Sequence, residues 1–379
     1  MSNNNLELYI HTPFCVKKCA YCDFLSAPAS MEAQRQYLLA LLQEIRSFPR
    51  KEAYEVVSVF FGGGTPSIWP SDWIEMVLAA LHDTFSFGNE PEITMECNPG
   101  TADVSKLVAY RSLGINRISF GLQSTDNREL RLLGRIHSFE TFCETYAAAR
   151  QAGFSNINID LMSALPGQTP ESWRETLNRV LALQPEHISA YSLIIEEGTP
   201  FYESYRAGKL ELVSEEMDRA MYHWTVDTLA EWGYGQYEIS NFAKAGRQSR
   251  HNRIYWQAEE YLGMGLGAHS YMDGKRFHNS YDLQKYISAK GDTSLLREDA
   301  ELITETDALA EFMFLGLRLT EGVSFARFRQ RFGKEMDTVY GKELQELTEL
   351  GLLLRDESGV RLSRRGIDVS NAVFERFLL

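Results

Sequence analysis

The sequence predicts an α/β protein in which six β/α units form a parallel sheet, followed by a smaller α+β domain. Three observations support this. Apolar, β-branched runs alternate with helical patterns over most of the chain, polar and glycine-rich stretches follow these runs, and the pattern changes from about residue 290. Successive β/α units form parallel strands with right-handed crossovers, so we expect one large sheet with helices against it.

Each expected element follows from local periodicity. The helix at 170–183 illustrates the signal, because its apolar residues fall on one face and Thr169 and Pro170 supply a cap and a first helical residue. The expected strands are 6–12, 56–62, 92–98, 117–123, 156–162 and 187–195. The other expected helices are 31–48, 71–86, 138–152 and 214–232. Periodicity leaves open whether the sheet curls into a barrel, but either form binds ligands at the carboxyl ends of its strands.

The C-terminal segment has the element order of a winged helix. Helices are expected at 305–319, 324–332 and 335–350, followed by a hairpin that turns at Asp356 to Gly359 and by a last helix. Winged helices often bind DNA, but residues 304–379 carry 11 Lys and Arg against 13 Asp and Glu. The third of these helices has Lys342 as its one cation among five acidic residues, so phosphates would repel it. We therefore expect a lid, packing or protein-contact role.

Composition narrows the class further. The formal net charge of -14 opposes broad phosphate binding, so no nucleic acid is expected as a partner. The N-terminus has no basic and apolar signal region, and no run of 18 apolar residues exists. Five cysteines, an odd number, favour reduced thiols and a cytoplasmic location over a disulfide framework.

Three of the five cysteines lie within eight residues. Cys15, Cys19 and Cys22 form C-x3-C-x2-C directly after the first expected strand. Three thiolates suit a 4Fe-4S cluster whose fourth iron keeps an open position. Two alternatives stay open from spacing alone: a zinc site completed by His11 or Cys97, and three unligated thiols.

The cysteine motif, with Tyr21 before its last cysteine and "GGGTPS" one β/α unit later, resembles the radical S-adenosylmethionine (SAM) superfamily. The resemblance implies a partial (β/α)6, TIM-like barrel. It also implies that the amino and carboxylate groups of SAM chelate the open iron, and that an electron from the cluster cleaves SAM to a 5′-deoxyadenosyl radical.

Polar residues at the strand ends fit that cofactor. Glycines allow the backbone to approach a ligand closely, carboxylates and amides can bind ribose hydroxyls or an amino group, and an arginine can pair with the methionyl carboxylate. Taken alone, Glu96, Gln123, Arg135 and Asp160 would each be interpreted as a polar residue with a structural role. The resemblance implies that they bind the cofactor instead. The expected SAM-binding residues are Tyr9, Tyr21, Gly63, Gly64, Thr65, Glu96, Gln123, Arg135 and Asp160.

Further motifs, among them "YIHTPFCVKKCAYCDF", "ECNPG", "SFGLQS", "LGRIHS" and "DLMSALPGQT", resemble the branch that contains oxygen-independent coproporphyrinogen III oxidase. The oxidase pattern has another cysteine where this chain has Phe24, and a long segment before the first strand where this chain has about eight residues. Both departures point to the sister family of HemW-type haem chaperones. That family implies haem binding and transfer to respiratory haem proteins without oxidase activity; the rival is radical decarboxylation of coproporphyrinogen III propionates.

The stretch "RHNRIYW", 250–256, matches the H-N-x-x-Y-W signature of the HemW-like group. An imidazole is a common axial ligand of haem iron, so His251 is the haem-binding candidate, and Tyr255 and Trp256 could pack on the macrocycle. Four nearby basic residues could hold the propionates: Lys244, Arg247, Arg250 and Arg253. The alternative is a basic loop in which His251 hydrogen-bonds locally and the aromatic rings fill the core.

The combined prediction is a radical SAM partial barrel over 1–290 and a winged-helix-like domain over 291–379. Its cofactors are a 4Fe-4S cluster and SAM, and haem is its cargo. The expected partners are recipient respiratory haem proteins. Peripheral membrane contact and a cofactor-dependent homodimer stay open.

Overall fold

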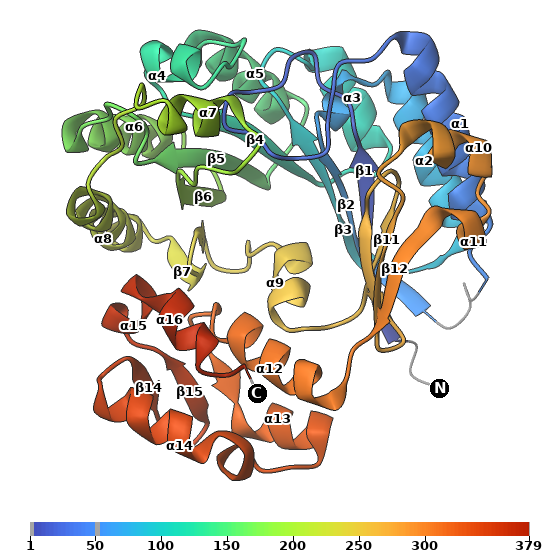
Figure 1. The fold of residues 1–379 in the computed structure, drawn as a ribbon. Helices are drawn as coiled ribbons and strands as arrows, with labels where there is room; N and C mark the ends of the chain where they lie inside the picture. Colours follow the sequence, from blue (N-terminus) through green and yellow to red (C-terminus); the bar gives the residue numbers. More distant parts are fainter. Residues whose placement is uncertain (1–3, 50–53, 379) are drawn as a thin grey trace.

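A computed structural model describes residues 4–49 and 54–378 (Figure 1). Six parallel strands form the centre of a large curved sheet, paired in chain order. The strands are β1 (Asn4–Thr12), β2 (Tyr54–Gly63), β3 (Ser86–Cys97), β4 (Arg117–Gln123), β5 (Ile157–Ser163) and β6 (His187–Ser192). This confirms the predicted α/β class and the order of its six β/α units.

Helices cover the outer face of the parallel strands (Figure 1). Those that follow β1 to β6 are α1 (Met31–Arg46), α2 (Ser71–Thr84), α3 (Val104–Ser112), α4 (Asn127–Leu132), α5 (Phe139–Gln151), α6 (Pro170–Ala182), α7 (Pro200–Arg206) and α8 (Glu215–Glu231). The predicted cap of α6 is confirmed, because the Thr169 side chain accepts a hydrogen bond from Ser172 N at 3.2 Å. Pro170 occupies the first turn, where a missing N–H costs nothing.

Short strands extend both edges of the parallel sheet. They give the strand order β12-β11-β10-β9-β1-β2-β3-β4-β5-β6-β8-β7. The added elements are β7 (Gly235–Glu238), β8 (Asn241–Ala243), α9 (Arg250–Trp256), β9 (Tyr261–Met264), β10 (His269–Met272), β11 (Lys275–Asn279), α10 (Leu283–Ala289), α11 (Thr293–Leu296) and β12 (Arg297–Leu302). The sequence did not indicate β9 and β10, since each is only four residues long and Gly263 interrupts the apolar residues of β9.

The C-terminal segment forms a second, smaller unit with a three-stranded antiparallel sheet in the order β13-β15-β14. Its elements are α12 (Glu305–Gly316), β13 (Val323–Ser324), α13 (Phe325–Phe332), α14 (Met336–Glu349), β14 (Leu353–Arg355), β15 (Gly359–Leu362), α15 (Arg364–Asp368) and α16 (Ser370–Glu375). The predicted turn is present: Asp356 Oδ1 accepts hydrogen bonds from Ser358 N and Gly359 N at 2.9 and 3.3 Å.

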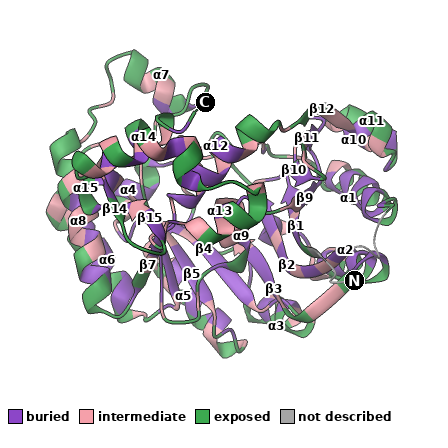
Figure 2. Cartoon of the chain, turned by 90° about the horizontal axis from the view of Figure 1, so that it is seen from below, coloured by how far each residue is buried: buried purple, intermediate pink, exposed green. Residues whose placement is uncertain are grey.

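Two hydrophobic cores hold these units. The larger consists of buried residues of the parallel strands and of the helices that pack on them, and Figure 2 shows these strands largely in the colour of buried residues. The smaller contains residues between Leu309 and Phe377. The strand β12 still pairs with β11 of the large sheet, so that sheet continues to Leu302. The division of the chain at residue 290 stays a prediction. Within 4–49 and 54–378, no helix is long and apolar enough to span a membrane.

The two units meet at β7 and α9. Thr320 N donates to Tyr237 O at 3.0 Å, and the guanidinium carbon of Arg318 lies 4.3 Å from the centre of the Trp256 ring. The Arg318 guanidinium also lies 3.4 Å from the carboxylate of Glu238, whose side chain is fully buried. This contact joins the second unit to the interior of the first.

Replacing Arg318 by alanine is expected to lower the free energy of unfolding by about 2 kcal/mol, because it leaves the buried Glu238 carboxylate without its cation. Urea unfolding would measure the change. Arg361→Ala is the control, since its pair with Asp356 is exposed and should change stability by less than about 0.5 kcal/mol. Equal effects of the two substitutions would argue against a stabilising role for the Glu238 contact.

Candidate functional site

The loop between β1 and α1 carries the three clustered cysteines. All three thiols are free and partly buried, and they line one cavity of about 120 Å³. Thr65 Oγ1 donates to Cys15 Sγ at 3.4 Å, and Arg135 Nη1 donates to Cys19 Sγ at 3.5 Å. Burial raises the pKa of the Cys22 thiol, and the neighbouring Cys19 and Cys15 raise it further. The thiols therefore lie close enough to raise the pKa of Cys22, and Cys15 and Cys19 each accept a hydrogen bond.

The donor set fits a cluster better than a single ion. In the described part of the chain, no three Cys, His, Asp or Glu side chains converge closely enough to hold one metal ion. A cubane spaces its cysteine sulfurs farther apart than a single ion does, because each sulfur binds a different iron. The predicted fourth zinc ligands are also engaged elsewhere: the His11 ring contacts the Tyr9 hydroxyl at 3.0 Å and Leu25 O at 2.9 Å, and Cys97 Sγ lies 3.7 Å from Asn98 O.

The glycine run at the end of β2 packs directly against the cysteine loop. Thr65 N donates to Phe14 O at 2.8 Å. A Cβ on Gly64 would lie 2.5 Å from that same carbonyl oxygen, so only glycine fits there. Gly63 has φ +108°, and its N–H donates to Glu96 Oε2 at 3.2 Å. The close contact at Gly64 and the positive φ of Gly63 explain why both positions need glycine.

Two acidic residues face the cavity from β3 and β5. Burial raises the pKa of Glu96 to about 8, and the nearby Asp160 contributes to the shift. Burial also raises the pKa of Asp160, although Asn158 Nδ2 and Ser119 Oγ donate to its oxygens at 2.8 and 3.1 Å. A cationic ligand group would stabilise both carboxylates in their charged form.

The pKa of Glu96 predicts a pH dependence of stability in the cofactor-free protein. Between the ordinary value of 4.5 and about 8, the folded state binds more protons than the unfolded state, so stability falls as pH rises. Glu96→Gln should flatten this slope, by at most about 1.4 kcal/mol per pH unit. Urea unfolding at several pH values between 5 and 8 would measure it, with the exposed Glu75→Gln as control. If stability changes with pH by the same slope in wild type and in Glu96→Gln, the pKa of Glu96 is not raised in the folded protein.

Arg135 links the cysteine loop to the strand ends. Besides Cys19, it donates to Gly121 O and, at 2.5 Å, to Asn98 Oδ1. Asn98 Nδ2 in turn donates to Thr65 Oγ1 at 2.7 Å. The sequence reasoning did not single out Asn98 as a site residue, although it lies directly after β3 within the quoted "ECNP".

Gln123 is the third polar strand end. It has φ +73° at the end of β4, a conformation that residues other than glycine rarely adopt and that is often found at functional sites. Ser119 and Gly121 line the same cavity from β4. Alternation along the strand, which points residues 119, 121 and 123 to one face, could have predicted both.

Most predicted residues come together. The same cavity is lined by every predicted cluster and SAM residue except Tyr9: these are Cys15, Cys19, Tyr21, Cys22, Gly63, Gly64, Thr65, Glu96, Gln123, Arg135 and Asp160. The structure thus brings together residues from the strands β2 to β5, or from the segments that follow them, and from the cysteine loop after β1. Their binding roles stay predictions.

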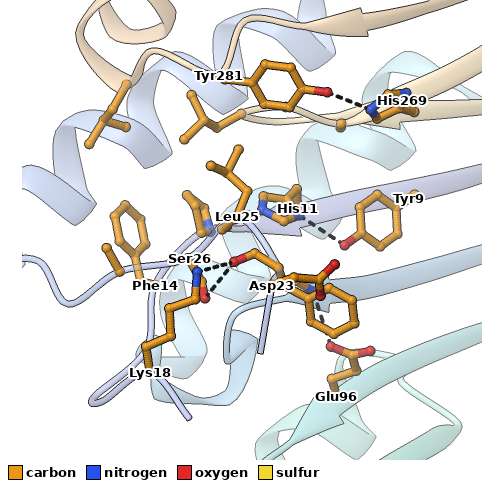
Figure 3. Close-up of a pocket in the computed structure, with 18 of the residues that line it drawn as sticks. Tyr9, His11, Phe14, Lys18, Asp23, Leu25, Ser26, Glu96, His269 and Tyr281 are labelled. Carbon is orange, nitrogen blue, oxygen red and sulfur yellow. Dashed lines mark hydrogen bonds between the residues drawn. The ribbon is translucent and has the colours of Figure 1, made fainter. Parts of the chain in front are cut away.

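Tyr9 lies in a second, larger cavity of about 950 Å³ (Figure 3). Its wall is more apolar than polar and includes side chains from the cysteine loop, β1, β9 and β10. Figure 3 shows Tyr281 and His269 on one side of this cavity and Glu96 and Asp23 on the other. The two cavities share Lys18, Phe24, Ser26, Gly63 and Glu96.

The structure places His251 apart from both cavities. Its ring is buried at the start of α9, with Nδ1 3.1 Å from Glu7 Oε2 and 3.2 Å from Ser58 Oγ. It stacks on Phe60 at 4.8 Å, and Tyr255 meets its edge at 4.9 Å. Burial lowers its pKa to about 3. Its ring meets protein groups on several sides, but the segment is a helix and the contacts of Nδ1 are with residues distant in the sequence, not local ones. Haem contact by His251 stays a prediction.

The surroundings of His251 differ from the predicted propionate site. Arg253 pairs with Glu321 at 2.8 Å, and Arg250 Nη1 donates to Glu90 O at 2.9 Å. Trp256 packs against Arg318, whereas Tyr255 lines the larger cavity. Of the three aromatic and imidazole groups in this signature, Tyr255 lines one of these two cavities, whereas His251 and Trp256 line neither.

A parallel six-stranded half-barrel with three cysteines after β1 and a glycine run after β2 defines a class of protein, the radical SAM proteins. In agreement, residues 9–180 match the Radical SAM superfamily and residues 303–369 match the HemN C-terminal domain. The chain belongs to the HemW family within this superfamily. It is 37% identical over 372 residues to "Heme chaperone HemW" of Bacillus subtilis, and 32% identical over 390 residues to the Escherichia coli protein of that name, with 98% of each chain covered in both cases.

Relatives also occur in animals. The chain is 34% identical to "Radical S-adenosyl methionine domain-containing protein 1, mitochondrial" of Bos taurus, with 97% of this chain and 86% of that one covered. Among solved structures, coproporphyrinogen III oxidase (HemN) of E. coli superposes with a TM-score of 0.84 at 25% identity, covering 99% of this chain and 90% of that one. The family implies a 4Fe-4S cluster and SAM as cofactors.

Proposed function

We propose that this protein is a haem chaperone that binds haem and transfers it to respiratory haem proteins. The observation that carries the proposal is its similarity, over 98% of both chains, to bacterial proteins named "Heme chaperone HemW". Phe24, where the oxidase pattern has a further cysteine, and the large apolar cavity beside the cysteine loop support it.

The same proposal assigns the cofactor roles. Cys15, Cys19 and Cys22 hold a 4Fe-4S cluster, which when bound to SAM can supply an electron for its reductive cleavage. Arg135 and Thr65 donate hydrogen bonds to the thiol sulfurs and so stabilise their charged form.

The polar strand ends would hold the rest of SAM. Glu96 and Asp160 are positioned to receive its amino group and hydroxyls, and the glycine run provides close backbone contact. We assign the cluster and SAM a regulatory role in oligomerisation or haem release. A homodimer, peripheral membrane contact and a cytoplasmic location remain predictions from the sequence.

The second candidate function is oxidative decarboxylation of coproporphyrinogen III, which the superposition with the E. coli oxidase favours. One experiment separates the two. The protein is reconstituted anaerobically with iron, sulfide and SAM, and is then given coproporphyrinogen III in one sample and haem in another. A chaperone yields a Soret band that persists through gel filtration and no protoporphyrinogen IX. Conversion to protoporphyrinogen IX would overturn the chaperone proposal.

A further inference from the structure

The larger cavity has the size and lining of a ligand site. Its volume of about 950 Å³ lies at the upper end of the range for small-molecule and cofactor sites. The lining includes Phe14, Leu25 and Leu266 on apolar walls, and the rings of Tyr9, Tyr255 and Tyr261. A large, flat, apolar ligand with a few polar groups would match such a surface.

Two imidazoles line this cavity within the described residues, and they differ in availability. Both ring nitrogens of His11 are engaged, one with the Tyr9 hydroxyl and the other with Leu25 O. His269 is exposed, and its Nε2 lies 2.9 Å from the Tyr281 hydroxyl (Figure 3). Its Nδ1 has no hydrogen-bond partner among residues 4–49 and 54–378. In the tautomer whose Nε2–H donates to the Tyr281 hydroxyl, Nδ1 keeps a lone pair that a metal can take.

Neighbouring groups hold the His269 ring in place. The buried ring of His278 lies 5.1 Å from that of His269 and 4.5 Å from that of Tyr281. His278 is itself fixed by Asn279 O at 2.8 Å and by Asp299 Oδ2 at 3.1 Å. A metal-binding histidine commonly hydrogen-bonds through its second nitrogen, and Tyr281 supplies that contact here.

We propose that haem binds in this cavity and that the imidazole of His269 ligates its iron. The proposal rests on the proposed haem-chaperone function and names a different residue from His251, whose ring reaches neither cavity. Although His269 is exposed, partial desolvation of its ring and the nearby His278 and Arg276 lower its pKa, which favours the neutral form that binds iron. Lys18, the one Lys or Arg among the described lining residues, can pair with a propionate.

The proposed haem site adjoins the site predicted for the cluster and SAM. The haem cavity and the cysteine cavity share the side chains of Lys18, Phe24 and Glu96. Haem bound there would lie beside the cluster and SAM, where each ligand can change the affinity of the other.

The test is a titration of ferric haem into the full-length apoprotein, followed in the Soret region. His269→Ala should weaken binding at least about tenfold and shift the band, and free imidazole should restore the wild-type spectrum. Tyr281→Phe should keep the ligand and the band position. His269 is exposed, so its substitution should leave folding intact, which circular dichroism would check.

Three results would overturn His269 as the iron ligand. The first is a His269→Ala protein that binds haem with unchanged affinity and spectrum. The second is loss of haem in His251→Ala but not in His269→Ala, which would place the haem at α9. The third is loss of the band in Tyr281→Phe alone, which would make the phenolate the ligand. Failure of the wild-type protein to bind haem is a separate outcome, and it would overturn the proposed function as well.

Discussion

Replacing Cys19 by alanine is expected to abolish incorporation of the 4Fe-4S cluster. The cage then has two thiolates where three are needed, and the Arg135 guanidinium loses its sulfur acceptor. After anaerobic reconstitution, bound iron and sulfide should fall at least about tenfold, and the broad visible absorption of the cluster should disappear with them.

Cys143→Ala is the matched control, because Cys143 is a free cysteine on α5 that does not line the cysteine cavity. It should retain wild-type iron and sulfide. A Cys19→Ala protein with full iron content would refute the three-cysteine cage. Stoichiometric zinc without iron or sulfide in anaerobically purified wild type would refute the cluster assignment itself.

Replacing Gly63 by alanine is expected to lower the free energy of unfolding by about 3 kcal/mol or more and to abolish SAM binding. Two causes combine. The φ of +108° is strained for any residue with a Cβ, and that Cβ would lie 2.4 Å from the His11 ring. Because Tyr9 and Leu25 hold this ring, it cannot move without breaking hydrogen bonds.

Gly153→Ala separates the two causes. Gly153 also has a positive φ, of +90°, but a Cβ there would have nothing within 4 Å. Its substitution should cost only backbone strain, about 1–2 kcal/mol, and leave SAM binding unchanged. Urea unfolding and calorimetric titration with SAM would measure both variants. If the Gly63→Ala protein is as stable as Gly153→Ala, the close approach of the new Cβ to His11 adds no destabilisation beyond backbone strain.

Local sequence carried enough information to predict the parallel strands and the loop in which the three cysteines lie together. The apolar run predicted at 156–162 corresponds to β5, and Thr169 and Pro170 mark the start of the helix α6. That the three thiols share one cavity could be predicted too, since Cys15, Cys19 and Cys22 occur within one loop, and their role as cluster ligands stays a prediction. The strands β9 and β10 could not be predicted in this way, because each has only four residues, too few for a periodic pattern, and Gly263 interrupts β9.

The sequence by itself determined the α/β class, the six β/α units and the family, because these depend on local periodicity and on motifs that are continuous in the chain. Only the tertiary structure decided which side chains share a cavity. His251, in a basic and aromatic segment, has its ring between Phe60 and Tyr255 in the interior, whereas His269, in a glycine-rich stretch, faces the large cavity beside Tyr281. The burial of His251 depends on contacts with distant residues, such as Ser58, which lies nearly two hundred positions away in the sequence. No local sequence pattern encodes such contacts.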